Sequence, residues 1–192
     1  MDGFKSWLKQ LIEQRTIVVF DLETSGLDKN RDYIIEVGAV KITNGKICDR
    51  FSTLVNSPQM EALSAEVEQL TGITFEQLKC APLIEDALKS FYEFAKGSIL
   101  VAHNLLFDLA FLCNWGDRCG ISFDEFEKDA MDTISLAEVI LGDKIKSFKL
   151  SSIAQYFDIE FTHHRALDDA ETTAKILLEL AVLQNGNLKR KH

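Results

Sequence analysis

The chain has 192 residues, of which 46% are hydrophobic, a size and composition sufficient for one well-packed domain and short for two. Its formal net charge of −9 argues against a large basic surface for duplex nucleic acid, but the carboxylates of a metal site would themselves contribute negative charge, so a nucleic-acid enzyme is not excluded. No apolar run approaches the roughly 20 residues of a membrane span, and nothing resembles a signal peptide. The four cysteines lack zinc-like spacing. We therefore expect a cytoplasmic protein with reduced thiols.

The first predicted elements are a helix and three strands. Apolar residues recur at helical spacing over 4–12, and we expect this amphipathic helix to pack on its own domain, with docking on a partner as the alternative. Asn44-Gly45 predicts a two-residue hairpin, because both central positions of a type I′ turn need positive φ. The predicted strands are residues 17–21, 33–42 and 47–55.

The rest of the chain is mainly helical by pattern, with one further short strand. The predicted helices cover residues 62–70, 74–78, 83–95, 104–115, 132–141, 150–157 and 168–183, and the strand covers 98–102. Strands that alternate with helices indicate an α/β fold. We expect an amino-terminal helix over 1–15, a single domain over 16–184 and a polar basic tail over 185–192.

Two carboxylates end the first predicted strand. Asp21 and Glu23 follow the apolar residues 18–20 and precede a sharp turn at 24–26. Because side chains alternate across a strand, both carboxylates project from one face, and they repel each other unless cations lie between them. The pair therefore suggests a divalent-metal site, although a structural role is the alternative for the pair taken alone.

A second carboxylate position lies where the strand 98–102 runs into a helix. Asn104 is placed to cap that helix, and Asp108 lies one turn later. The positive end of the helix dipole favours an anion there. An ordinary first-turn aspartate is the alternative interpretation.

A third motif combines histidines with aspartates at the start of the last helix. His163/Asp168 and His164/Asp169 share the same spacing, so spacing alone does not choose between them. Ala166, Asp169, Ala170 and Thr173 share one helical face, whereas Asp168 points roughly 100° away. If that face packs on the sheet, Asp169 faces the site and Asp168 faces solvent.

Together the three motifs resemble the DEDDh family of 3′→5′ exonucleases, typified by the proofreading subunit of bacterial DNA polymerase III. The resemblance runs from about residue 16 to residue 183, and the closest likeness is to the exonuclease domain of PolC-type polymerases. It implies a ribonuclease-H-like fold, with a mixed sheet of about five strands flanked by helices and the first three strands antiparallel. The segment 70–74 also looks like the family's loop beside the substrate terminus.

The resemblance also implies a set of site residues. By motif position, Asp21, Glu23, Asp108 and Asp169 would hold two Mg²⁺ or Mn²⁺ ions, and His164 would be the general base. This assignment agrees with the pairing that the helical face favours. The residues that the resemblance places against the terminal nucleotide are Thr24, Gly26, Leu27, Thr71, His103, Asn104 and Phe107.

Several of these assignments have plain structural alternatives. Phe107 is equally suited to the core, and Thr71 to an ordinary loop role. Ser25 stands where many relatives carry a second threonine, a conservative change. Leu63-Ser64 replaces the Ile-Pro that often opens the segment before the loop at 70–74, so the helix there is expected to start differently.

The implied activity is release of nucleoside 5′-monophosphates from single-stranded or frayed DNA 3′ ends, in proofreading or repair. An RNA-trimming exoribonuclease is the alternative within the enzyme class, because discrimination depends on how the pocket treats the 2′-OH. A non-catalytic subunit that binds a polymerase would be expected to lose an acidic ligand or the histidine, and the motifs retain them all. A polymerase partner would act in trans, through the helix at 4–12 or the basic tail; no membrane partner is expected.

Overall fold

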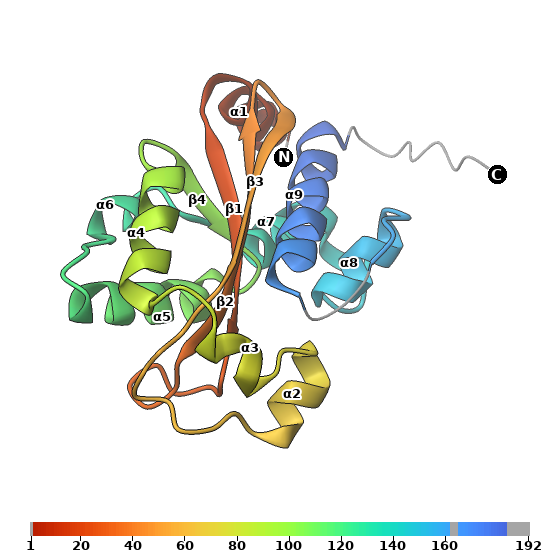
Figure 1. Ribbon diagram of the computed structural model, residues 1–192. Helices are drawn as coiled ribbons and strands as arrows, with labels where there is room; N and C mark the ends of the chain where they lie inside the picture. The colour runs from red at the N-terminus through yellow and green to blue at the C-terminus, as the bar shows by residue number, and fades with distance from the viewer. Residues whose placement is uncertain (1, 162–164, 184–192) are drawn as a thin grey trace.

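A five-stranded mixed sheet runs through the middle of the molecule, with helices on both faces (Figure 1). The computed structural model describes residues 2–161 and 165–183. The strands, in the spatial order β3-β2-β1-β4-β5, are β1 (Ile17–Thr24), β2 (Ile34–Thr43), β3 (Lys46–Leu54), β4 (Ile99–Ala102) and β5 (Met131–Asp132). The first three strands pair antiparallel, and β4 and β5 run parallel to β1, which confirms the expected sheet.

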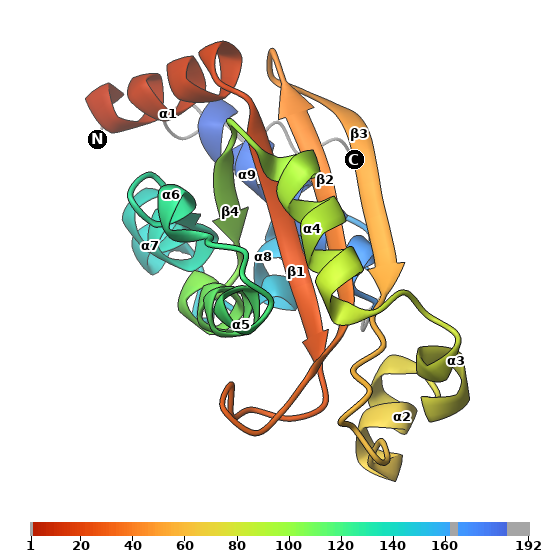
Figure 2. The same cartoon turned by 60° about the vertical axis from the view of Figure 1, so that its left-hand side comes forward.

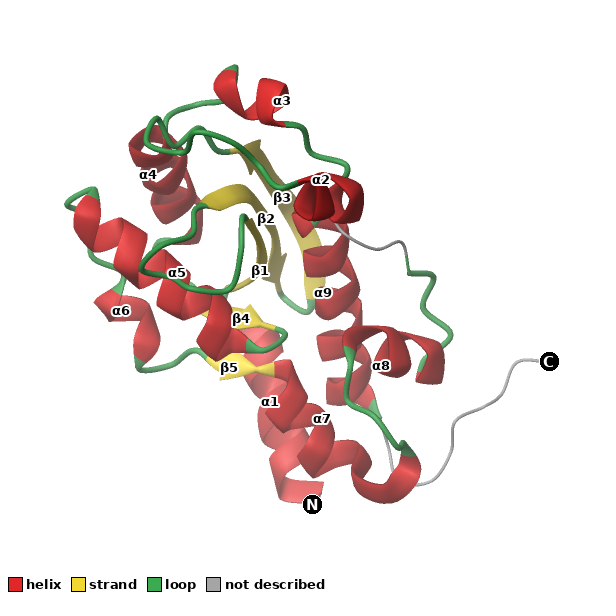
Figure 3. Ribbon diagram, turned by 90° about the horizontal axis from the view of Figure 1, so that it is seen from below, coloured by secondary structure: helices red, strands yellow, loops and turns green. Residues whose placement is uncertain are grey.

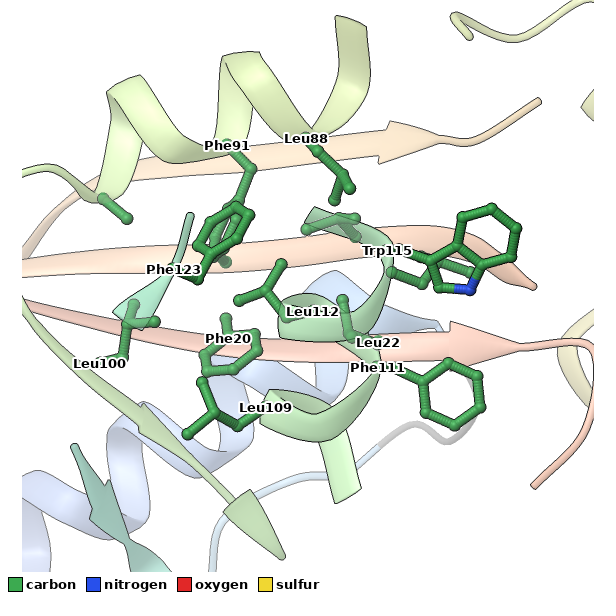
Figure 4. Close-up of a cluster of buried hydrophobic side chains, with 14 of the residues drawn as sticks. Phe20, Leu22, Leu88, Phe91, Leu100, Leu109, Phe111, Leu112, Trp115 and Phe123 are labelled. Carbon is green, nitrogen blue, oxygen red and sulfur yellow. The ribbon is translucent and has the colours of Figure 1, made fainter. Parts of the chain in front are cut away.

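One face of the sheet carries a large apolar layer. Val18, Phe20 and Leu22 of β1 point to this face, which α4 (Ile84–Ala95) and α5 (Leu105–Arg118) cover (Figure 2). Figure 4 shows the side chains of the sheet and of these helices packed together. The short helix α6 (Asp124–Glu127) closes the edge of the same layer.

The opposite face is covered by helices from the two ends of the chain. Ile17 and Val19 of β1 point to this side, because successive side chains of a strand alternate between its faces. The covering helices are α1 (Asp2–Gln14), α7 (Thr133–Leu141), α8 (Leu150–Tyr156) and α9 (Ala166–Val182). Leu8 and Ile12 of α1 are buried against this layer, so the amphipathic helix packs on its own domain as expected.

Two short helices form a separate small cluster beyond the end of the sheet. These are α2 (Ala65–Thr71) and α3 (Phe75–Lys79), which pack on Ile35 around Ile73 and Leu78. The α2 helix starts three residues later than predicted, because the Ser64 hydroxyl accepts a hydrogen bond from the Val67 N–H and acts as its cap.

The predicted hairpin is confirmed, and three short elements were missed. Asn44 and Gly45 have φ values of 53° and 72°, as a type I′ turn requires. The helix α6, the 3₁₀ turn η1 (Gly142–Lys144) and the two-residue strand β5 are too short to show a period in the sequence. Within the described ranges, the protein has no helix of the length and apolarity that a membrane crossing requires.

Candidate active site

The carboxylates at the end of β1 point toward α9, because they continue one side of the strand. Asp21 and Glu23 lie on the same face as Ile17 and Val19, whose neighbours include α9. Along this face the apolar side chains of Ile17 and Val19 are followed by the carboxylates of Asp21 and Glu23 at the end of β1. The prediction that the two acidic side chains share a face is confirmed by their proximity.

The start of α9 brings a third carboxylate to the same point. Ala170 is buried and Asp168 is exposed, so the helix turns Asp169 inward as the face argument predicted. Carboxylate oxygens of Asp21, Glu23 and Asp169 all lie within 4.8 Å of one another. Seen from below in Figure 3, α5 and α9 lie on either side of β1 and β2.

Asp108 reaches the cluster from the other side, through the gap left where β4 ends. β4 pairs with β1 only over Ile17–Val19, while β1 continues to Thr24. Beyond that point Asp108 Oδ1 accepts a hydrogen bond from the Leu22 N–H at 3.1 Å, and the side chain is only 3% exposed. Asp108 therefore takes the place of a neighbouring strand at this position.

The start of α5 is fixed by a carboxylate from a different segment. Asn104 occupies the N-cap position in a left-handed conformation, with φ of 72°, but within the described chain its side chain makes no cap bond. Asp132 Oδ1 instead accepts from the Asn104 N–H at 3.0 Å and the Leu105 N–H at 3.4 Å. The expectation that Asn104 caps this helix through its side chain was therefore wrong, because Asp132 already serves these donors.

The pKa values at the site show that the crowded carboxylates resist ionisation together. Burial raises the pKa of Glu23 to about 7, and Asp169 adds to the shift. Burial also raises the pKa of Asp108 to about 8, against the opposing hydrogen bond from the Leu22 N–H. The pKa of Asp21 is raised well above its ordinary value, first by burial and then by Asp108, Asp169 and Glu23.

This donor set fits hard divalent cations. Carboxylate oxygens are the ligands that Mg²⁺ and Mn²⁺ prefer, and the four acidic side chains converge from β1, α5 and α9. A cation among them would offset the burial and mutual repulsion that raise the pKa values of Asp21, Glu23 and Asp108. The residues present therefore fit a divalent-metal centre.

A fifth acidic side chain, beside the four of the cluster, was missed in the sequence. Glu36 of β2 lies directly opposite Glu23 in the sheet register, is 1% exposed, and forms an ion pair with Arg165. The signal was present, since Glu36 is a charged residue inside the otherwise apolar run 34–40. Such a residue demands a partner, because an unpaired buried charge is strongly unfavourable.

The loop after β1 forms one rim of the site. The Thr24 hydroxyl donates to the Gly26 carbonyl oxygen at 2.6 Å, and a Cβ at Gly26 would lie 2.4 Å from a carboxylate oxygen of Asp32. A side chain at residue 26 would displace the Asp32 carboxylate, which accepts a hydrogen bond from the Asp28 N–H within the same loop. Leu27, which follows this turn, is 86% exposed. The loop after the carboxylate-bearing strand therefore leaves an apolar side chain open to solvent.

Three of the predicted contact residues lie at the start of α5. The His103 ring bonds through Nδ1 to the Thr133 hydroxyl at 2.9 Å, and burial lowers the pKa of His103. Phe107 is half-buried and packs against Phe111, with ring centroids 5.0 Å apart. Asn104 is exposed at the same end of the helix. The His103 ring is thus engaged within the protein, while Asn104 remains accessible.

Thr71 lies at the end of α2, and the histidine motif falls outside the described chain. The Thr71 hydroxyl donates to the Val67 carbonyl oxygen at 2.8 Å and accepts from the Ile73 N–H at 3.1 Å, so it braces the loop itself. His163 and His164 lie outside the residues that the structure describes, and their roles stay a prediction.

Comparisons with known proteins agree with this geometry. The family model described as Exonuclease matches residues 18–177. DNA polymerase III PolC-type from Caldanaerobacter subterraneus subsp. tengcongensis is 44% identical over 164 residues, which are 85% of this chain and 11% of that protein. The chain thus spans about a tenth of the length of this relative.

Solved structures share the fold. Escherichia coli Exonuclease I in complex with a dT13 oligonucleotide superposes with a TM-score of 0.77 at 16% identity, over 88% of this chain and 41% of that chain. The nuclease domain of 3′hExo, described as a DEDDh family member bound to rAMP, superposes with a TM-score of 0.74 at 21% identity, over 87% of this chain and 92% of that chain. Both likenesses support the ribonuclease-H-like fold that the sequence motifs implied.

Proposed function

Since this chain belongs to the exonuclease family, we propose that it is a metal-dependent 3′→5′ exonuclease that releases nucleoside 5′-monophosphates from DNA ends. The observation that carries the proposal is the convergence of Asp21, Glu23 and Asp169 oxygens within 4.8 Å, with Asp108 buried beside them. Four carboxylates gathered at the end of a central strand are a costly arrangement for a purely structural role.

In this proposal the four carboxylates hold two divalent ions, Mg²⁺ or Mn²⁺. Such ions, when bound, supply Lewis-acid stabilisation of the charge that develops on the phosphate oxygens during an in-line displacement. The contribution of the chain is to fix the carboxylates before substrate arrives. Asp108 is fixed by the Leu22 N–H, and Asp169 by the packing of the α9 face that carries the buried Ala170.

His164 is the proposed general base. An unperturbed imidazole has a pKa near 6.5, so it accepts a proton from an attacking water at neutral pH. His164 precedes by five residues the aspartate that α9 turns toward the cluster, which supports its assignment over His163.

The rim of the site supports contacts with the terminal nucleotide. We propose that Leu27, Asn104 and the half-buried Phe107 border the terminal base and sugar, with the Thr24–Gly26 turn holding Leu27 outward. His103 and Thr71 are engaged in bonds within the protein, so their proposed contribution is to shape the rim.

DNA is favoured as the polymer because the PolC-type relative is a DNA polymerase by name. RNA is the second candidate, since the 3′hExo nuclease domain, which shares the fold, was solved with rAMP bound. The PolC context also suggests a polymerase partner. Because Leu8 and Ile12 of α1 are buried within the domain, the half-exposed Trp7 is an apolar side chain that this helix offers to such a partner.

A digestion panel tests the proposal. Single-stranded, duplex, mismatched and RNA oligomers of matched sequence, labelled at the 5′ end, are incubated with Mn²⁺, with Mg²⁺ and with chelator. We expect a ladder that shortens from the 3′ end, 5′-monophosphate products and no cleavage with chelator. Cleavage that persists in chelator would overturn the proposal, and faster cleavage of RNA than of DNA would transfer it to RNA.

A further inference from the structure

Glu36 and the start of α9 form a clamp that joins the helix to β2. Arg165 donates to Glu36 from Nη2 at 2.7 Å and from Nε at 3.2 Å, and the Ala166 N–H donates to Glu36 Oε2 at 3.0 Å. One buried carboxylate thus binds the N-cap residue of α9 and the first N–H of the helix together. We call Glu36, Arg165 and Ala166 the Glu36 clamp.

Gly38 lets the helix approach β2 closely enough for this clamp to form. A Cβ at Gly38 would lie 2.1 Å from the Ala166 carbonyl carbon and 2.1 Å from the Leu167 nitrogen, both of them backbone atoms. Backbone atoms cannot move aside as the end of a long side chain can, so this contact requires glycine at residue 38. The contact packs the first turn of α9, which Glu36 also binds, against β2.

Glu36 lies at a position where a carboxylate is energetically unfavourable. It lies directly across the sheet from Glu23, and like charges directly opposite each other destabilise a strand pair. It also raises the pKa of both Asp21 and Glu23, while Arg165 lowers that of Glu23. Both of its oxygens already accept hydrogen bonds from the clamp, so Glu36 is not a further ligand of the acidic cluster.

We propose that Glu36 is a positioning residue, which holds the first turn of α9 on β2 and thereby sets the Asp169 carboxylate beside Asp21 and Glu23. Asp169 lies three residues after Ala166, so the clamp acts within one helical turn of it. A carboxylate oxygen of Asp169 lies within 4.8 Å of those of Asp21 and Glu23. In this proposal, that distance is kept only while the first turn of α9 remains packed on β2. The inference rests on the proposed function, because it assigns to Glu36 the preorganisation of a metal ligand.

The test compares Glu36→Gln with Glu171→Gln. In Glu36→Gln one acceptor oxygen becomes an NH₂ group that faces a donor of Arg165 or Ala166, so the clamp is broken at nearly constant volume. Glu171 pairs with Arg50 of β3 from the next turn of α9, so Glu171→Gln removes a matched glutamate–arginine pair outside the first turn. Both variants and the wild type are titrated with Mn²⁺ alone by calorimetry, and hydrolysis of single-stranded DNA is measured against Mn²⁺ concentration.

We expect Glu36→Gln to weaken Mn²⁺ binding roughly 10- to 100-fold, as loss of an outer partner of a metal ligand does, with kcat largely recovered at saturating Mn²⁺. Glu171→Gln should keep the affinity of the wild type. Arg165→Lys keeps the positive charge but loses the bidentate guanidinium donor, so it should weaken Mn²⁺ binding to an intermediate degree. Because the Arg165 side chain is half-exposed, this variant is the substitute if Glu36→Gln does not fold.

The outcomes distinguish the proposed function from the positioning role of Glu36. A wild type that neither binds Mn²⁺ nor hydrolyses nucleic acid overturns the proposed function. The positioning role alone is overturned by a different result. In that case the wild type binds Mn²⁺ and hydrolyses nucleic acid, but Glu36→Gln or Arg165→Lys lowers only the melting temperature and keeps the Mn²⁺ affinity of Glu171→Gln.

Discussion

The helices α5 and α9 start in comparable ways on opposite sides of β1 (Figure 3). Each begins with an N-cap residue, Asn104 or Arg165, whose side chain caps nothing among the described residues, and each carries an aspartate four residues later. Asp108 and Asp169 are those aspartates. In both helices a carboxylate from a distant segment binds the first backbone N–H groups in place of a local cap.

The two starts differ in what else holds them. Only two residues separate α5 from β4, which pairs with β1, so the sheet itself fixes where this helix begins. Between β5 and α9 the described residues contain no strand, so we look to side chains for what seats the start of α9 on the sheet. The added ion pair of Arg165 with Glu36 and the close approach at Gly38 supply that attachment. The comparison indicates that α9 depends on its clamp more than α5 does.

The largest expected effects come from removing the aspartates themselves. Asp108→Asn and Asp169→Asn should each lower kcat by about 10³-fold or more, since stabilisation by a bound ion contributes several kcal/mol to such reactions. Initial rates on single-stranded DNA at saturating Mn²⁺ measure this. Asp168→Asn is the control, because Asp168 is exposed and should retain the wild-type rate. A comparable loss in Asp168→Asn would reverse the assignment of the two neighbouring aspartates.

A histidine precedes the N-cap residue of each helix, and the two should behave differently. His164→Ala should lose about 10²- to 10⁴-fold in rate, as expected for a general base, and retain Mn²⁺ binding. His103→Ala should mainly lower the melting temperature, because its ring bonds to the Thr133 hydroxyl inside the fold. Rates and thermal unfolding of both variants test the contrast, and an undiminished rate in His164→Ala would move the base to His163.

The sequence predicted those parts of the site that depend on local periodicity. Alternation along a strand placed Asp21 and Glu23 on one face, and helical spacing chose Asp169 over Asp168, as the structure confirms. A regular element with one buried face is enough to place these side chains. The family resemblance added Asp108, which spacing alone did not distinguish from an ordinary first-turn aspartate.

The supporting contacts were beyond such reasoning because they join segments far apart in the chain. Glu36 and Arg165 are separated by 129 positions, and Asp132 reaches Asn104 across 28. Neither pairing follows from any period, and neither acidic residue differs in type from those on the surface. The strand β5 was missed for a related reason, since its two residues are defined only by pairing with β4.

The stability of the metal-free protein should fall as the pH rises from about 5 to about 8. Burial raises the pKa of Glu23 to about 7 and that of Asp108 to about 8, so over this range the folded state binds more protons than the unfolded state. The free energy of unfolding then decreases with pH, by at most about 3 kcal/mol from Glu23. Urea titrations in chelator measure the slope.

Two additions sharpen this pH experiment. Asp108→Asn should flatten the slope, because it removes one of the groups whose pKa is raised, whereas the exposed Asp168→Asn should not. Saturating Mn²⁺ should restore stability above neutral pH, since a cation favours the ionised carboxylates. A slope that is unchanged in Asp108→Asn would show that this buried carboxylate does not titrate as the geometry requires.

The smallest effect on metal binding is expected from Asp132, which binds the first N–H groups of α5. Asp132→Ala removes the acceptor for the Asn104 and Leu105 N–H groups and for the Ile134 N–H at the start of α7, so unfolding should become easier by about 1–2 kcal/mol for each helix start. Mn²⁺ affinity should fall by less than about 3-fold, because β4 and the Leu22 N–H still place Asp108. A loss of affinity as large as that of Glu36→Gln would instead mean that both helix starts depend equally on a distant carboxylate, and that direct connection to a strand contributes little to placing a metal ligand.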